Sequence, residues 1–199
     1  MTAAIWIGCG VAAYLLGSIP TGYLWAKAKG IDIRTVGSGN IGATNVMRAL
    51  GKGPGIMVLV IDALKGFLPV FFAPRIFEGG SHLQILCCVG VIAGHNWTCW
   101  LNFKGGKGIA TSAGALLAML PGPFGCVLAV WAGVFAVSRY VSLASIVAAA
   151  VLPVATWFWQ RDLVWFTGLI AVVAIWKHKS NIQRLRAGTE NRVGGKKTQ

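Results

Sequence analysis

Long apolar stretches separated by short polar segments follow one another along most of the chain. They cover residues 4–26, 54–77, 82–101, 108–120, 123–137, 141–159 and 162–176. Because a helix needs roughly 20 residues to cross the hydrocarbon core of a bilayer, most of these stretches have the length of a membrane span. The fourth and fifth are shorter, and the Pro-Gly-Pro sequence at 121–123 is either a tight turn or a break in one long helix. We expect an all-α, polytopic membrane bundle of about seven transmembrane helices, with residues 1–190 forming a single domain.

The basic residues are concentrated in alternate connecting segments. With the N-terminus outside, 15 of the 18 Lys and Arg residues fall in cytoplasmic segments, which leaves Arg75 and Arg161 outside and Lys65 within a span. Since short cytoplasmic loops are enriched in Lys and Arg, this distribution predicts an outside N-terminus and a cytoplasmic C-terminus.

The composition is typical of a membrane protein and narrows the choice of partners. Of the 199 residues, 56% are apolar and 12% are charged, and the net charge is +13. Basic segments beside anionic lipid headgroups account for that charge, so no nucleic acid partner is expected. Residues 191–199 have the composition of a basic, disordered tail. The five cysteines fall in apolar stretches without zinc-ligand spacing, and we expect no metal site.

The first cytoplasmic segment contains G-x-G-x-x-G, the spacing of a dinucleotide-binding turn. It lies in GSGNIGATNVMRALGK, residues 37–52. No strand is expected before it and a membrane helix follows it, so the βαβ unit that this motif needs is missing. Asp62, at the position of a ribose-binding acid, falls inside the second apolar stretch, three residues before Lys65. We therefore reject a dehydrogenase and interpret Asp62 and Lys65 as a buried ion pair that anchors the helix, with a functional role as the alternative.

The same segment has the composition of a phosphate-binding loop. Glycine lets backbone N–H groups approach an anion, neutral side chains add donors, and an arginine fork matches the geometry of phosphate. The residues concerned are Gly37, Ser38, Gly39, Asn40, Thr44, Asn45 and Arg48. The alternative is a tight turn whose polar groups only cap the following helix.

Two further cytoplasmic segments favour phosphate binding. FKGGKGIAT, residues 103–111, places Lys104 and Lys107 around Gly105 and Gly106, just before a helix N-terminus that would favour a bound anion. It lacks the order and spacing of a Walker A loop, so ATP is not implied. KHKSNIQRLRAGTE, residues 177–190, adds His178, Asn181, Arg184 and Glu190.

Together these segments resemble the bacterial membrane acyltransferases that transfer a fatty acyl group from acyl phosphate to glycerol 3-phosphate. GSGNIGATNVMRALGK matches the family pattern throughout, as do DALKG at 62–66 and RYVSLASI at 139–146. In GHNWTCWLNFKGGKGIAT, residues 94–111, Thr98 stands where proline is common, and Lys179 follows His178 where arginine is usual. The positions that hold in the third segment are Asn181, Ile182, Arg184, Leu185, Gly188 and Glu190.

The resemblance implies a compact helical fold in the bacterial inner membrane with a site that faces the cytoplasm. Acyl phosphate and glycerol 3-phosphate would react there to give lysophosphatidic acid and phosphate for phospholipid synthesis, with no cofactor and without acyl-CoA or acyl carrier protein as direct donor. Membrane lipid would surround the enzyme. A soluble enzyme that makes acyl phosphate is a possible further partner at the cytoplasmic face.

We expect direct acyl transfer, because acyl phosphate is a mixed anhydride with a good leaving group and needs mainly positioning and charge stabilisation. The catalytic candidates are Ser38, Arg48, Lys107, His178 and Asn181. The substrate-binding candidates are Gly37, Gly39, Asn40, Thr44, Asn45, Lys104, Gly105, Gly106, Ser142 and Gly188. Asp62, Lys65, His95 and Glu190 are expected to support the site, the last by clamping Arg48 or another basic group. The proton acceptor is either the phosphate of glycerol 3-phosphate or a histidine.

Two other classes of function remain open. A transporter of anions or phosphate esters would fit the spans, but such proteins tend to carry inverted repeats and helices broken at the bilayer midplane, and we find no internal repeat. A lipid-binding scaffold would explain the basic loops but not their glycine spacing. Within the enzyme class, Ser38 as a nucleophile lacks a G-x-S-x-G elbow or a neighbouring acid.

Overall fold

The computed structural model describes residues 2–194 and consists over that range of helices joined by turns. The chain divides into two compact units, Met1–Met119 and Leu120–Gln199. The first unit contains α1 (Ala3–Ser18), α2 (Thr21–Lys27), α3 (Ala43–Leu50), α4 (Lys52–Ile76), α5 (Gly80–Asn96), the 3-10 turn η1 (Cys99–Leu101) and α6 (Ile109–Met119). The second contains α7 (Pro121–Ser138), α8 (Val141–Trp159), the 3-10 turn η2 (Arg161–Leu163), α9 (Val164–Lys177) and α10 (Lys179–Arg186). That residues 1–190 form one domain stays a prediction.

Four helical segments of the described chain are long and apolar enough to cross a membrane. They are Ala3–Lys27, which joins α1 and α2, and the helices α4, α7 and α8. Helices α5, α6 and α9 have 17, 11 and 14 residues, fewer than the roughly 20 that a span needs. The all-helical membrane fold is therefore confirmed, whereas the count of seven spans and the orientation of the termini stay predictions.

Helix α7 is longer than its apolar stretch suggested. It begins at Pro121 and runs for 18 residues, because proline fits the first turn of a helix, where the missing N–H has no partner to lose. Leu120, just before it, has a non-helical φ of −135°. The Pro-Gly-Pro sequence thus starts a helix and does not interrupt one.

The first apolar stretch is interrupted at Pro20, which the sequence interpretation treated as part of one span. Proline has no N–H and its ring clashes with the preceding turn, so α1 ends at Ser18 and α2 begins at Thr21. The carbonyls released by the break find side-chain donors: Thr98 Oγ1 donates to the Ser18 carbonyl at 2.6 Å and Lys65 Nζ to the Ile19 carbonyl at 2.8 Å.

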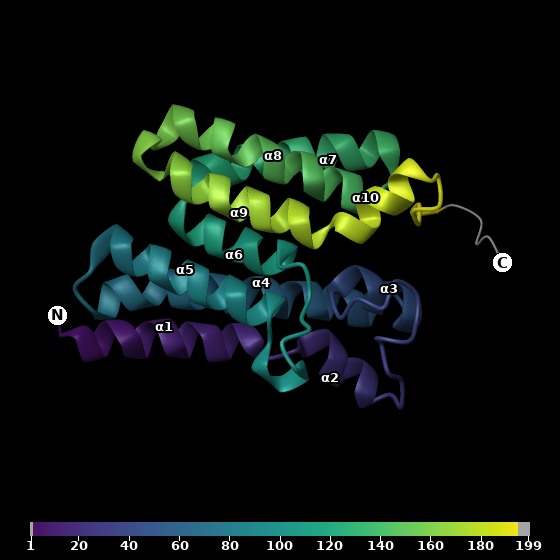
Figure 1. Ribbon diagram of the computed structural model, residues 1–199, viewed down its shortest axis with the longest axis horizontal. Coiled ribbons are helices and arrows are strands. Elements are labelled where there is room, and N and C mark those ends of the chain that lie inside the picture. The colour runs from purple at the N-terminus through teal and green to yellow at the C-terminus, as the bar shows by residue number, and fades with distance from the viewer. Residues whose placement is uncertain (1, 195–199) are drawn as a thin grey trace. The chain divides into compact units, whose positions relative to one another are not determined.

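Close contact between helix backbones holds the first unit together, and Figure 1 shows α1, α4 and α5 running alongside one another. A Cβ on Gly94 of α5 would overlap the Tyr14 carbonyl of α1, and one on Gly114 of α6 would overlap the Ala63 carbonyl of α4. Small residues allow such approach between membrane helices, where packing replaces the hydrophobic effect as the main attraction. The glycines of these helices therefore fix the positions of the polar residues that α4 and α5 carry.

In the second unit α8 packs against both α7 and α9, and the three helices run side by side (Figure 1). Trp131 Nε1 of α7 donates to Ser145 Oγ of α8 at 3.2 Å. After α10 the chain returns to the turn between α7 and α8, where the Val193 N–H donates to the Arg139 carbonyl at 2.9 Å. The start of the expected disordered tail is thus hydrogen-bonded to the fold, and residues 195–199 lie outside the described residues.

Candidate active site

The loop before α3 is folded around one buried amide, that of Asn45. Its Oδ1 accepts a hydrogen bond from the Ser38 N–H at 2.9 Å, and its Nδ2 donates to the carbonyls of Ile33 at 3.1 Å and Val36 at 2.9 Å. Asn45 is 2% exposed. Both of its amide hydrogens are used inside the loop, so the structure gives Asn45 the role of holding Ser38 in place and leaves it no donor for a ligand.

The two glycines beside Ser38 are required by the shape of the same loop. Gly37 and Gly39 have φ values of 62° and 68°, in the left-handed region that residues with a Cβ rarely adopt. Asn40 Oδ1 then accepts a hydrogen bond from the Gly42 N–H at 2.9 Å, where α3 begins. Asn40 therefore orders the entry to α3.

Helix α3 carries two polar candidates on one side. Thr44 is half-buried and Arg48 is exposed, and residues four apart are neighbours on a helix surface. The helix rests on a buried apolar cluster that consists of Ala26, Ile33, Ile41, Val46 and Val58. The Thr44 hydroxyl and the Arg48 guanidinium thus lie one turn apart on α3, and the packing of the apolar side of α3 holds this helix in place.

The predicted ion pair between Asp62 and Lys65 is present inside the first unit. Lys65 Nζ lies 2.8 Å from Asp62 Oδ1, and both side chains are almost fully buried. His95 Nδ1 of α5 lies 3.9 Å from the same oxygen, and Lys65 also donates to the Ile19 carbonyl. A buried charge is costly unless it is paired, and here the ion pair and the Lys65 hydrogen bond connect α4, α5 and the break after α1.

The glycine-rich segment at 104–108 packs on the last turn of α5. The Gly105 N–H donates to the Asn96 carbonyl at 3.2 Å and the Gly106 N–H to the His95 carbonyl at 2.9 Å. A Cβ on Gly106 would overlap the imidazole of His95. Close contact with α5 explains why glycine is needed at both positions, and the N–H groups of both glycines are hydrogen-bonded within the protein. The sequence interpretation had assigned Gly105 and Gly106 to the close approach of a ligand.

Two lysines flank these glycines and provide the positive charge of the segment. Lys104 is exposed and Lys107 is half-buried, and α6 begins at Ile109. A helix N-terminus adds partial positive charge of its own. The positive electrostatic potential of this segment therefore comes from the two ammonium groups and from the start of α6.

In the second unit Glu190 binds three side chains. Its Oε1 accepts from Ser142 Oγ at 2.9 Å and from Asn181 Nδ2 at 2.8 Å, and its Oε2 accepts from Arg184 Nε at 2.7 Å. Burial alone would raise the pKa of Glu190, but the hydrogen bonds from Asn181, Arg184 and Ser142 together lower that pKa below its ordinary value. The carboxylate is therefore charged at neutral pH. The basic group that it clamps here is Arg184.

His178 occupies the junction between α9 and α10. It is 3% exposed, and its Nδ1 lies 2.8 Å from the Ala174 carbonyl. Because a carbonyl only accepts, Nδ1 carries a hydrogen, and in the neutral ring Nε2 is the basic nitrogen. Asn181 follows one helical turn later, which places an imidazole and a carboxamide on neighbouring positions of one helix.

Gly188 has a structural role at the end of α10. Its φ is 70°, and its N–H donates to the Leu185 carbonyl at 3.2 Å. A left-handed glycine just after the last turn is a frequent way to end a helix. This role accounts for Gly188 without a substrate.

Sequence reasoning missed the polar contacts that tie η1 to α1. Thr98 donates to the Ser18 carbonyl, and Tyr14 Oη donates to the Trp97 carbonyl at 2.8 Å. The signal was available in Thr98, which departs from the proline of the family pattern. Its φ of −65° is that of a proline, so the threonine keeps the backbone and adds a donor.

Comparison with known proteins places the chain in one family. The sequence profile described as glycerol-3-phosphate acyltransferase matches residues 7–188. A glycerol-3-phosphate acyltransferase of Desulforamulus reducens is 51% identical over 191 residues, which cover 94% of this chain and 95% of the relative. One from Geobacter sulfurreducens is 50% identical over 184 residues, covering 90% and 93%.

Two solved structures extend the similarity to the fold. The crystal structure of PlsY (YgiH), an integral membrane glycerol 3-phosphate acyltransferase, in its glycerol 3-phosphate form has a TM-score of 0.89 and 40% sequence identity, with 94% of both chains covered. Its lysophosphatidic acid form has a TM-score of 0.86 and 39% identity over the same shares. The chain therefore belongs to the glycerol-3-phosphate acyltransferase family of integral membrane proteins.

Proposed function

We propose that the protein transfers a fatty acyl group from acyl phosphate to glycerol 3-phosphate and releases lysophosphatidic acid and phosphate. The main support is that the family match spans residues 7–188 and so includes the first two motif segments and residues 177–188 of the third. The similar PlsY structures are described with glycerol 3-phosphate and with lysophosphatidic acid, which supports these two molecules as substrate and product here. The resemblance of the motifs to that family supports acyl phosphate as the donor.

The reaction needs no covalent intermediate. A hydroxyl oxygen of glycerol 3-phosphate attacks the acyl carbonyl carbon, the new ester bond forms, and the bond from that carbon to the phosphate oxygen breaks. The leaving phosphate departs without being protonated, so the enzyme mainly positions the hydroxyl and stabilises charge. The hydroxyl proton passes to the phosphate of glycerol 3-phosphate, whose second pKa lies near 6, as in phosphate monoesters on proteins.

The side chains divide into those that bind phosphate and those that hold them in place. We assign phosphate binding and charge stabilisation to Arg48, Lys104, Lys107, His178 and Asn181, and orienting hydrogen bonds to Ser38 and Thr44. The internal hydrogen bonds of the other candidates support a positioning role for them: Asn45 for Ser38, Glu190 and Ser142 for Asn181, and His95 with the Asp62–Lys65 pair for the segment at 104–108.

The membrane arrangement is part of the proposal. We place the N-terminus outside, seven spans across a bacterial inner membrane, and the reacting groups at the cytoplasmic face, where a soluble enzyme can deliver acyl phosphate. The charge distribution supports this orientation, with only Arg75 and Arg161 outside. Cysteines added beside Gly51 and Gly188 should react with a membrane-impermeant label only from the cytoplasmic side, and one added beside Gly79 only from outside. Labelling of the site beside Gly79 from the cytoplasm would overturn the orientation.

Purified protein assayed with acyl phosphate and labelled glycerol 3-phosphate tests the reaction. Lysophosphatidic acid should form together with an equal amount of phosphate. A transporter or a scaffold would give neither product. Formation of lysophosphatidic acid from acyl-CoA but not from acyl phosphate would keep the family activity and reject the proposed donor.

A further inference from the structure

The chain after α10 closes over the turn between α7 and α8. Arg192 Nε donates to the Ser138 carbonyl at 3.1 Å, and the Val193 N–H donates to the Arg139 carbonyl at 2.9 Å. We call residues 191–194 the C-terminal strap. The strap and the turn that it contacts both belong to the second unit.

The end of α7 suits such a contact. The last carbonyls of a helix have no partner within the helix and carry partial negative charge, and α7 ends at Ser138. Arg139 follows with a φ of 60°, in the left-handed region that often ends a helix. The Arg192 guanidinium brings a donor and a positive charge to these carbonyls. Its Cζ also lies 5.9 Å from the centre of the Tyr140 ring, within the range of a cation–π contact.

Glu190 is therefore held on both sides along the chain. Before it, the Thr189 N–H donates to the Arg184 carbonyl at 2.9 Å, and after it the strap is bonded to the turn. Ser142, which donates to Glu190 Oε1, lies in the first turn of α8, two residues after Tyr140. The side-chain bond to Ser142 and the bonds of the strap thus join the same two segments of the chain, and each limits the movement of the other.

The position of Glu190 sets that of the Asn181 carboxamide. Asn181 Nδ2 donates to Glu190 Oε1 at 2.8 Å, and Asn181 is 4% exposed. Because one end of a carboxamide donates and the other accepts, this hydrogen bond decides which end of Asn181 faces the carboxylate. Groups at a reacting centre have to be held within about 0.5 Å, and a displacement of about 1 Å can lower a rate by about 100-fold. A strap that holds Glu190 can therefore affect turnover without touching a substrate.

We propose that the C-terminal strap is a positioning element of the candidate active site, in which Arg192 and Val193 hold Glu190 and, through it, the Asn181 carboxamide. Both strap residues lie beyond the family match, which ends at residue 188. The inference rests on the proposed function, which assigns Asn181 to phosphate binding and charge stabilisation. The orientation of Asn181 then depends on a segment of the chain outside its own motif.

Two substitutions of similar length at Arg192 test this role. Glutamine places an amide nitrogen at the same position along the side chain as Nε of arginine but has no charge, whereas methionine keeps the length and has neither donor nor charge. Arg192→Met should lower kcat about threefold to tenfold and change KM for glycerol 3-phosphate about twofold or less, because the cations assigned to phosphate stay in place. Arg192→Gln should keep kcat within about twofold of the wild type, because it keeps the donor.

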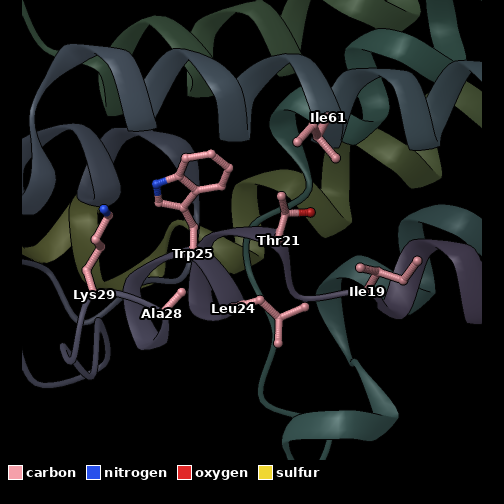
Figure 2. A pocket seen from close by; sticks show the side chains of 7 residues that line it. All are labelled: Ile19, Thr21, Leu24, Trp25, Ala28, Lys29 and Ile61. Atoms are coloured by element: carbon pink, nitrogen blue, oxygen red, sulfur yellow. The ribbon is translucent and has the colours of Figure 1, made fainter.

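Matched controls remove other exposed cations. Arg186→Met removes one from the end of α10 in the same unit. Lys29→Met removes one from the first unit, where Lys29 lines an apolar groove at the break between α1 and α2 (Figure 2). Both controls should leave kcat unchanged. Equal losses for all the variants would mean that only positive charge matters, and a wild-type kcat for Arg192→Met would likewise reject the proposal.

The second anchor of the strap is tested through its backbone. Val193→Pro removes the N–H that donates to the Arg139 carbonyl and should lower kcat in the same range as Arg192→Met. Val193→Ala keeps this N–H and should not lower kcat. If Arg192→Met and Val193→Pro lower only the yield of folded protein, and each folded molecule keeps the wild-type kcat, the strap has a structural role alone and the proposal is wrong.

Thermal unfolding in detergent tests the link to Glu190 without turnover. A double-mutant cycle measures whether two residues act through each other. At neutral pH, the fall in unfolding temperature caused by Glu190→Gln should shrink to about half or less when Arg192→Met is also present, because a carboxylate that is not held in place contributes less stability. Additive falls would mean that Arg192 and Glu190 act separately, and the proposal would be rejected.

The two kinds of measurement separate the strap from the proposed reaction. If the wild-type protein makes no lysophosphatidic acid but the unfolding cycle shows coupling, the proposed function fails while the hold of the strap on Glu190 is confirmed. If lysophosphatidic acid forms and the cycle is additive, the proposed function stands and the inference about the strap is wrong.

Discussion

Replacing Asn45 by alanine should damage catalysis by releasing the loop that carries Ser38. The substitution removes three hydrogen bonds, to the Ser38 N–H and to the carbonyls of Ile33 and Val36. At about 0.5–1.5 kcal/mol each, their loss destabilises the loop by about 1.5–4.5 kcal/mol. Part of this free energy should be seen in global unfolding in detergent, and the rest as local opening of the loop.

The kinetic pattern separates positioning from binding. With Ser38 displaced, kcat should fall at least tenfold while KM for glycerol 3-phosphate changes about twofold or less. Asn45→Asp should be as harmful as alanine, because a carboxylate keeps the acceptor for Ser38 but turns an unprotonated oxygen towards two carbonyls. Asn40→Ala, which removes one half-buried hydrogen bond, is the control and should cost about 0.5–1.5 kcal/mol.

One result would refute this reasoning about Asn45. If Asn45→Ala keeps the wild-type unfolding midpoint and kcat but raises KM for glycerol 3-phosphate tenfold or more, the side chain contacts the substrate directly. The hydrogen bonds to Ile33 and Val36 would then contribute little, and the assignment of Asn45 to substrate binding from the sequence would be right.

Three further predictions concern charges. Lys107→Ala should lower kcat/KM by about 2–4 kcal/mol, the range for removing a charged contact from a shielded site, while Arg75→Ala should change it little; equal small losses would mean that only general charge matters. Lys65→Met should destabilise the protein by about 3–5 kcal/mol in detergent unfolding because it leaves a buried carboxylate unpaired, and the double variant with Asp62→Asn should recover part of this loss; no recovery would contradict a direct pair. Folding lowers the pKa of Glu190, so the contribution of its carboxylate to stability is complete above its ordinary pKa of 4.5 and is lost as the pH falls through the folded value. The difference in unfolding temperature between the wild type and Glu190→Gln should therefore be constant at pH 6–8 and shrink below pH 4.5. A difference that does not change with pH would disprove this linkage.

The regular helices could be predicted from the sequence because the long apolar stretches correspond to helices, and because residues three or four apart lie on the same face of a helix. The bounds of α8, Val141–Trp159, are those of the apolar stretch, and the pair of Asp62 and Lys65 followed from their separation of three residues. The break at Pro20 was missed because the residues around it are as apolar as those of the helices, so hydropathy shows no interruption. Proline chemistry had to outweigh the pattern at that position.

Contacts between loops and distant residues could not be predicted in the same way. The partners of Asn45 are backbone atoms of an irregular loop, and Glu190 meets Ser142 across 48 residues. No periodicity relates such positions, so the sequence could suggest that these residues are functional but not which atoms they bind. Several candidates for ligand binding consequently proved to have internal partners.

The internal partners of these residues shift the proposed binding of phosphate from backbone N–H groups to side-chain cations. A glycine-rich loop suggests backbone N–H groups that cradle an anion, but the N–H groups of Gly105 and Gly106 are donated to α5. The two proposed substrates each carry a phosphate and would bring several negative charges, because a phosphate monoester holds about −1.5 to −2 at neutral pH. Side-chain cations have to balance that charge, and the candidate segments of the first unit offer Arg48, Lys104 and Lys107. Phosphate binding should therefore weaken steeply with salt and with the loss of any one of these cations, as expected for point charges and not for a rigid backbone nest.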